Sequence, residues 1–244
     1  MLLRWPEIYS NTEVLSPVDR ETWRVIGEAS EIGASSRVIE LASGKGAFAS
    51  YLAKNFGCSI EGFDHNSEFV DYSNNRAREL GLQQRVRFNV ADINQLEVAD
   101  DSYDLGVCLG ALYIFRENGW KVLTRAVKSG GHLAISDMLH RKAPAPKAVM
   151  DVFFEDQDQP LTLEDARHWY TDRGVRILQE EVCSQMAWLD YYDLTKKMLL
   201  QISKNHFANK DLQAEVEEGL REDRLVRKYR QQYIDYVTFI MRKV

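Results

Sequence analysis

The feature that most constrains this 244-residue chain is the glycine-rich segment Ile39–Ala49, which reads IELASGKGAFA. This pattern is typical of a buried strand, a tight turn and the start of a helix, whose free backbone N–H groups can bind a nucleotide-like ligand. Residues 44–49, GKGAFA, fit the alanine-ended dinucleotide fingerprint. Glu40 is not part of that fingerprint, so the rest of the chain has to identify the ligand.

Alternating strand and helix patterns follow this segment. Glycines end the apolar helical runs at Gly57 and Gly81, and Ser16-Pro17 predicts the N-terminal cap of an earlier helix that reaches about Ser30. Alternation and β-branched density predict five strands, at residues 38–41, 58–64, 86–92, 103–109 and 132–137. Five strands with intervening helices predict a parallel, doubly wound α/β sheet.

The pattern changes in the last third of the chain. Thr162 and Asp165 form a capping box for a helix to about Asp172, and residues 175–182 read as a sixth strand. Residues 186–231 are helical and rich in spacings such as Glu217 to Arg221, which indicate a solvated helix face. A final strand is predicted at residues 233–241, and the pattern alone leaves its direction open.

Composition limits the classes of partner. A formal charge of −6 gives no general attraction to nucleic acid or to an anionic membrane, so we expect neither as a partner. Cys58, Cys108 and Cys183 are far apart and indicate neither disulfides nor a metal site. No signal peptide or apolar run of roughly 20 residues is present. We therefore expect one cytoplasmic domain over residues 1–244, of unspecified oligomeric state.

Acidic residues stand at four predicted strand ends. Glu40, Asp64, Asp92 and Asp137 follow or end strands of the predicted sheet. In an open α/β sheet the ligand binds beyond the carboxyl ends of the strands, so these acids are expected to converge on one crevice. Asp64 alone suits any adenosine cofactor, because a ribose-binding acid is common about 20 residues after the first glycine. Glu40 and Asp92 are the more discriminating residues.

With these motifs, residues 37–137 resemble the class I S-adenosylmethionine-dependent methyltransferases that modify small molecules. The segment 40–46, ELASGKG, resembles the family's first motif, EGFDHN its second, VADINQL its third and SYDLGVCLGALY its fourth-strand motif. Ala42 replaces the commoner glycine and Ser43 the commoner cysteine or threonine. The resemblance implies a Rossmann-like seven-stranded sheet with helices on both faces, whose last strand is antiparallel, and a helical lid.

The resemblance also implies cofactor-binding residues. Glu40 would lie near the amino group of the cofactor through water, and Asp64 would accept hydrogen bonds from both ribose hydroxyls. His65 would lie beside the adenine, Asp92 would accept from the adenine amino group and Ile93 would offer a backbone contact. The backbone would approach the methionine part at Ala42, Gly44, Gly46, Leu109 and Gly110.

Catalytic residues are less defined by the sequence. Tyr113, Asp137 and His140 are the candidates, with His140 expected in a flexible surface loop. Aromatic residues that could cover an apolar or cationic acceptor are Trp5, Tyr9, Tyr113, Trp188 and Tyr192, and Phe153, Phe154 and Glu155 could line its pocket.

The resemblance therefore implies an enzyme that transfers a methyl group from S-adenosylmethionine to a small molecule by in-line displacement, with S-adenosylhomocysteine as product, and we expect no metal. Residues of about 1–30 and 186–231 would cap the acceptor site. One alternative is an NAD(P)-dependent oxidoreductase, which would leave Asp92 unexplained and lacks a recognisable Tyr-x-x-x-Lys pair. A second is a non-catalytic cofactor-binding protein. A nucleic-acid methyltransferase fits less well, because there is no basic stripe with interleaved aromatic residues.

Overall fold

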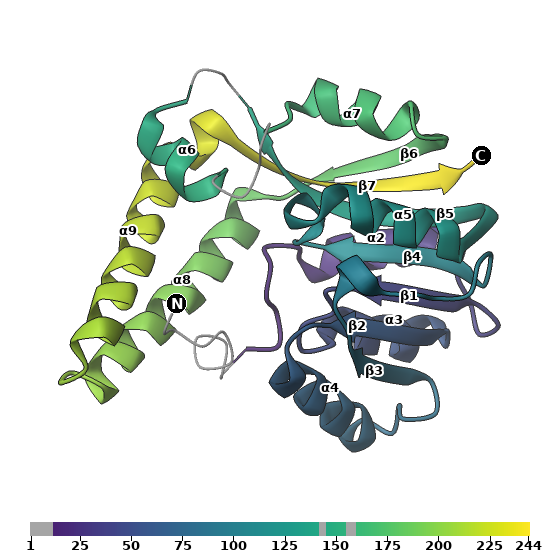
Figure 1. Cartoon of the computed structure of the whole chain (residues 1–244), viewed down its shortest axis with the longest axis horizontal. Helices are drawn as coiled ribbons and strands as arrows, with labels where there is room; N and C mark the ends of the chain where they lie inside the picture. The colour runs from purple at the N-terminus through teal and green to yellow at the C-terminus, as the bar shows by residue number, and fades with distance from the viewer. Residues whose placement is uncertain (1–11, 142–144, 155–159) are drawn as a thin grey trace.

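The strands around the glycine turn belong to one seven-stranded sheet in the computed structural model, which describes residues 12–141, 145–154 and 160–244 (Figure 1). The strands are β1 (Arg37–Leu41), β2 (Ser59–Asp64), β3 (Val86–Val90), β4 (Tyr103–Leu109), β5 (Val127–His140), β6 (Val175–Val182) and β7 (Ile234–Lys243). Their order is β3-β2-β1-β4-β5-β7-β6, and β7 runs antiparallel to both of its neighbours. The predicted Rossmann-like seven-stranded fold is confirmed, and the direction of its last strand is antiparallel.

Helices cover both faces of this sheet. They are α2 (Arg20–Ala29), α3 (Ala47–Phe56), α4 (Ser67–Glu79), α5 (Arg116–Ala126), α6 (Lys147–Phe153), α7 (Leu163–Thr171), α8 (Gln185–Asn205) and α9 (Lys210–Tyr233), with short 3-10 turns η1 (Ile93–Gln95) and η2 (Leu112–Ile114). The apolar sides of α2, α3 and α4 share one core with the sheet, and those of α5 and α7 share another. The parallel strands are therefore buried on both faces, as a doubly wound sheet requires.

The long helices α8 and α9 stand apart from these layers, beyond the carboxyl ends of the parallel strands (Figure 1). Leu199 and Ile202 of α8 pack with Leu212 and Val216 of α9 in a small core of their own, which also takes in Phe69 of α4. The helical hairpin formed by α8 and α9 therefore packs at the sheet edge at which a ligand binds in this type of fold.

Local signals placed most helix ends correctly. Thr162 and Asp165 form the predicted capping box of α7, and Gly57 ends α3 in the left-handed conformation. The predicted cap at Ser16 is wrong. Asp19 caps α2 instead, because its carboxylate accepts hydrogen bonds from both the N–H and the hydroxyl of Thr22.

The fifth strand is longer than predicted, at both ends. It pairs with β4 first through Val127 and, after a register shift, again from His132, so residues 128–131 lie opposite Asp104 alone in an irregular, bulged part of the strand. It continues past Asp137 to His140 because β7 pairs with it up to Ile234. Asp137 therefore lies inside a strand and not at its end, and His140 is not in a loop. In contrast, β3 stops at Val90, before Asp92.

Candidate functional site

The glycine turn has a backbone that only small residues adopt readily. Gly44 and Gly46 have φ values of 53° and 70°, and Ala42 has a φ of 52°. A Cβ atom at Gly46 would lie 2.3 Å from the ring of Phe88, and one at Gly44 would lie 2.5 Å from a methyl carbon of Leu15. The turn therefore leaves room for backbone groups at its surface but not for larger side chains.

Asp64 holds this turn from the end of the neighbouring strand. Its Oδ2 accepts a 2.8 Å hydrogen bond from the N–H of Gly44, and its Oδ1 accepts one of 2.9 Å from the N–H of Asn66. Each carboxylate oxygen can accept more than one hydrogen bond. Asp64 is thus positioned by the protein while it retains lone pairs for a ligand.

Glu40 is buried beside Asp64 and is incompletely satisfied. Its side chain is 4 % exposed, and its Oε2 has no hydrogen-bond partner among the described residues. Burial raises the pKa of Glu40 to about 8, and the negative charge of Asp64 adds to this effect. A cationic ligand group here would favour the ionised carboxylate, so the site fits the ammonium group of an amino-acid-like ligand such as the methionine part of S-adenosylmethionine.

Asp92 and His65 lie at the outer end of the same edge. The exposed Asp92 caps η1 by accepting hydrogen bonds of 2.9 Å from the N–H of Asn94 and from the side chain of Gln95, and these bonds hold its pKa below its usual value. The Nδ1 of His65 lies 3.6 Å from Oδ1 of Asp64. The next residue along, Ile93, is buried. The structure therefore brings three predicted cofactor residues close together, while their contact with a ligand stays a prediction.

The end of β4 meets the last strand and the N-terminal segment. Leu109 is the last residue of β4, and Gly110 follows it with a φ of 98°. A Cβ atom at Gly110 would lie 2.8 Å from the hydroxyl oxygen of Tyr236 and 2.9 Å from Cβ of Ser16. Tyr236 is 3 % exposed, and its hydroxyl has no partner among the described residues.

Asp137 is not positioned as the strand-end acid that the sequence predicted. It is fully buried and accepts hydrogen bonds of 2.6 Å from the hydroxyl of Tyr170 and 2.9 Å from Nη1 of Arg116. Asp137 and Leu139 are two residues apart on β5, so their side chains lie on the same face of the sheet. Leu139 packs in the core with α5 and α7. Because Glu40 is on the α3 side of the sheet, beside Val38, Asp137 does not join the other acids.

His140, predicted as a surface histidine, is buried. Its side chain is 9 % exposed, its ring packs edge-on against Phe154 at 4.7 Å, and its Nε2 has no partner among the described residues. Burial lowers the pKa of His140, so the neutral imidazole is favoured. A neutral imidazole whose nitrogen has no partner can accept a proton, so His140 is the candidate whose chemistry suits a general base.

Tyr113, the third candidate, lies on η2 near three residues that the sequence analysis missed. Burial raises the pKa of Tyr113, with further contributions that include those of Tyr191 and Glu222, and burial likewise raises the pKa of Tyr236. Tyr236 looked like core because it alternates within a strand, and Glu222 looked like one more acid on a solvated helix. No sequence signal separates either residue from its neighbours.

The structure describes some of the aromatic residues that were predicted to cover the acceptor. Trp188 and Tyr192 stack with ring centroids 5.5 Å apart, and both are buried. Phe153 and Phe154 are buried in the same core. Trp5, Tyr9 and Glu155 lie outside the described residues.

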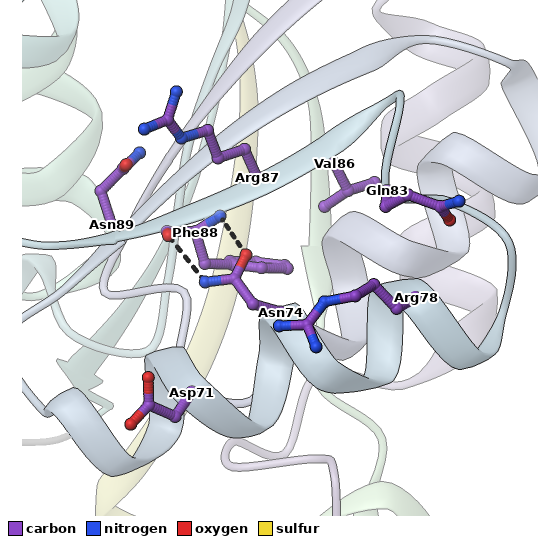
Figure 2. A pocket seen from close by; sticks show the side chains of 8 residues that line it. All are labelled: Asp71, Asn74, Arg78, Gln83, Val86, Arg87, Phe88 and Asn89. Carbon is purple, nitrogen blue, oxygen red and sulfur yellow. Dashed lines mark hydrogen bonds between the residues drawn. The ribbon is translucent and has the colours of Figure 1, made fainter.

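A surface hollow lies behind the glycine turn, between α4 and β3 (Figure 2). The Asn74 side chain forms two hydrogen bonds with the backbone of Phe88, one to its carbonyl at 2.9 Å and one from its N–H at 3.1 Å. These bonds pair backbone groups of an edge strand that no other strand covers. They also fix Phe88, whose ring is close to Gly46 and Gly62. Asn74 therefore supports the turn through Phe88, and none of Glu40, Asp64 and Asp92 lines the hollow.

The described residues include neither a membrane-spanning helix nor a cluster of metal ligands. Within residues 12–141, 145–154 and 160–244, no helix has the length and apolar character to cross a membrane. In the same residues, no three His, Cys, Asp or Glu side chains gather as metal ligands would.

Known proteins identify the class to which this fold and site belong. The family described as "Methyltransferase domain" matches residues 32–199. The chain belongs to this family. The predictions of a class I S-adenosylmethionine-dependent methyltransferase and of an enzyme are thereby confirmed.

Individual relatives are distant but cover much of the chain. The uncharacterized protein YjhP of Escherichia coli is 25% identical over 218 residues, which are 86% of this chain and 87% of that protein. The methyltransferase GfsG of Streptomyces halstedii is 28% identical over 139 residues, which are 56% of this chain and 50% of that protein.

Two solved structures resemble the fold closely. An S-adenosylmethionine-dependent methyltransferase from Thiobacillus denitrificans in complex with S-adenosylhomocysteine has a TM-score of 0.88 at 21% identity, and the match covers 100% of each chain. Its counterpart from Geobacter sulfurreducens, also with S-adenosylhomocysteine, has a TM-score of 0.85 at 21% identity and covers 98% of this chain and 97% of that one. These similarities confirm the seven-stranded fold.

Proposed function

We propose that the protein transfers a methyl group from S-adenosylmethionine to a small-molecule acceptor by in-line displacement, leaving S-adenosylhomocysteine. The observation that carries this proposal is the glycine turn held by Asp64, with Glu40 beside it, whose Oε2 has no hydrogen-bond partner among the described residues. When bound, the sulfonium cofactor supplies an electrophilic methyl group. The protein then has to hold the two reactants in line in a dry site, and such positioning can lower a barrier by roughly 7 to 11 kcal/mol.

The positions of the side chains support the following roles at the cofactor end. Glu40 binds the amino group of the methionine part, through water, and Asp64 accepts the ribose hydroxyls with its remaining lone pairs. The exposed carboxylate of Asp92, with His65 and Ile93 beside it, takes the adenine end. The backbone approaches the methionine part of the cofactor at Ala42, Gly44, Gly46, Leu109 and Gly110.

The acceptor end lies beyond Gly110, under the hairpin of α8 and α9 and the segment before α2. A base is needed only when the acceptor atom arrives protonated. His140 suits that role because burial lowers its pKa, which favours the neutral imidazole, and because its Nε2 has no partner among the described residues. Tyr113 would line the acceptor site, whereas Asp137 keeps Arg116 and Tyr170 in place.

The proposal extends to domain organisation, cellular compartment and partners. The chain acts as one domain over residues 1–244, in which residues of about 1–30 and 186–231 cap the core, in the cytoplasm and without nucleic-acid or membrane partners. Free thiols at Cys58, Cys108 and Cys183 support a reducing compartment, and the charge of −6 supports a small partner over a polyanion.

Methyl transfer can be tested directly with S-adenosylmethionine that carries a labelled methyl group. We expect label to pass from the cofactor to members of a mixed panel of amines, phenols, carboxylates and thiols, with one S-adenosylhomocysteine formed for each methyl group transferred. Cofactor binding without transfer to any acceptor, repeated on broader metabolite extracts, would favour the non-catalytic alternative. Reduction of a nicotinamide cofactor instead would favour the oxidoreductase.

A further inference from the structure

A row of aromatic rings leads from the cofactor end of the site to the helical hairpin. It begins at Tyr236, whose hydroxyl is next to Gly110. Tyr236 packs edge-on against Trp188 with centroids 5.6 Å apart, and Trp188 stacks on Tyr192. We name Tyr236, Trp188 and Tyr192 the aromatic row.

The aromatic row ends at a carboxylate. The hydroxyl of Tyr192 donates a 3.0 Å hydrogen bond to Oε1 of Glu222 on α9. Glu222 is half-buried, and no Lys, Arg or His of residues 12–141, 145–154 or 160–244 forms an ion pair with it. Burial raises the pKa of Glu222 above its usual value, and the nearby acids Glu218 and Asp223 act in the same direction.

The next residue on the helix shows the opposite arrangement. Asp223 is 2 % exposed and is paired with Lys196 at 3.2 Å and with Arg227 at 2.7 Å. Burial acts to raise the pKa of Asp223, but these two cations outweigh it and the pKa is lowered. The protein therefore neutralises one of two adjacent acids and leaves the other facing tyrosines.

One basic group, Arg230, lies beside the aromatic row but forms no ion pair with Glu222. The guanidinium of Arg230 lies 5.1 Å from the ring centre of Trp188, but it donates its 2.8 Å hydrogen bond to the carbonyl of Cys183. Partly desolvated carboxylates without a cation are costly, and aromatic faces favour cations. The combination of an uncompensated acid and aromatic rings is what a cationic ligand requires.

We propose that Glu222 and the aromatic row form the recognition site for the acceptor, and that this acceptor is a small cationic molecule that carries an ammonium group. The inference rests on the proposed methyl transfer and narrows its substrate class. Glu222 and the aromatic row hold the positive charge, and the hydroxyl of Tyr236, which has no partner among the described residues, meets the acceptor beside Gly110. Tyr236 and Glu222 are binding residues in this account, and the atom that is methylated is left open.

The test compares choline with its uncharged carbon isostere, 3,3-dimethylbutan-1-ol, by calorimetric titration of the full chain, both free and saturated with S-adenosylhomocysteine. We expect the cation to bind at least about tenfold more tightly than the isostere, the scale of a desolvated cation–aromatic contact. Glu222→Gln should remove most of that preference. Glu218→Gln, the same change on the exposed, Arg221-paired acid one turn earlier, should leave the preference intact.

The outcomes separate this proposal from the one on which it rests. Selective binding of choline that depends on Glu222 supports the cationic site, whether or not S-adenosylhomocysteine binds. Equal binding of both probes, preference for the isostere, or no binding of choline overturns it, even if S-adenosylhomocysteine binds well. The comparison of probes on the unaltered protein remains decisive if Glu222→Gln does not fold.

Discussion

The two ends of the site are built in different ways. The cofactor end uses backbone: Ala42, Gly44 and Gly46 have positive φ values, and Asp64 contacts the turn from the adjacent strand. The proposed acceptor end uses side chains from η2 and from the consecutive elements α8, α9 and β7, so it combines two regions that are far apart in the chain. The first is therefore readable in a short motif, whereas the second exists only after folding. Substitutions at the first should act through backbone strain and cofactor affinity, and those at the second through selectivity.

The largest effect is expected at the glycine turn. Gly46→Ala would place a Cβ 2.3 Å from a ring carbon of Phe88 in a left-handed backbone, so we expect a loss of about 3 to 4 kcal/mol in the free energy of unfolding. Gly81→Ala is the matched control, since Gly81 also has a φ of 70° but its Cβ would meet nothing within 4 Å. It should lose about 1 kcal/mol, close to the left-handed backbone cost alone. Equal losses in urea unfolding would show that Phe88 does not restrict the turn.

A second effect, on affinity, is expected at Asp64. Asp64→Ala should weaken binding of S-adenosylhomocysteine by roughly 2 to 3 kcal/mol, the scale of hydrogen bonds to a charged group. Asp104→Ala is a control for the loss of a strand acid, because Asp104 bonds to Arg37 and Lys128 and not to the turn. Unchanged affinity in folded Asp64→Ala would remove Asp64 from the site.

The pH dependence of stability tests the burial of Glu40 beside Asp64. Its pKa in the folded protein is about 8, above the ordinary value of 4.5, so the folded state retains the proton as the unfolded state loses it. The resulting stability is fully present below about pH 4.5 and is lost as the pH rises through about 8, by at most about 1.4 kcal/mol per pH unit. Urea unfolding of the ligand-free protein between pH 5 and pH 9 should show this loss, and Glu40→Gln should abolish it. An identical slope in both proteins would contradict the assignment.

The smallest effect is expected where the two ends meet. Leu15 lies against Gly44 and also packs on the small core between α8 and α9. Leu15→Ala should lower the free energy of unfolding by about 1 kcal/mol, as a half-buried leucine side chain does, and should speed dissociation of S-adenosylhomocysteine. Leu178→Ala, at a residue 39 % exposed on β6, should leave dissociation unchanged. Equal dissociation rates in stopped-flow measurements would show that the two ends are independent.

The sequence predicted those features that depend on a few neighbouring residues. The turn at Gly44 and Gly46, the capping box at Thr162 and the glycine end of α3 are local, and each was found where its residues stand. The seven-stranded topology followed from the alternation of strands and helices together with the family resemblance.

Features that depend on tertiary pairing could not be predicted in this way. His140 is buried because β7 extends β5 to its level, and nothing within ten residues of His140 signals that pairing. Asp137 looked like a strand-end acid until the longer strand placed it between Arg116 and Tyr170. Glu222 differs from the other acidic residues of α9 because Tyr192 of α8 lies opposite it.

The most direct test of the central claim is calorimetric titration of the purified protein with S-adenosylmethionine, S-adenosylhomocysteine and the nicotinamide dinucleotides, after a check for any that co-purify. We predict saturable binding of the two sulfur compounds and none of the dinucleotides, with affinity that depends on Asp64. Binding of a nicotinamide dinucleotide alone would contradict the account. It would mean that the segment Ile39–Ala49 is a redox fingerprint and that Glu40 and Asp92 serve another purpose.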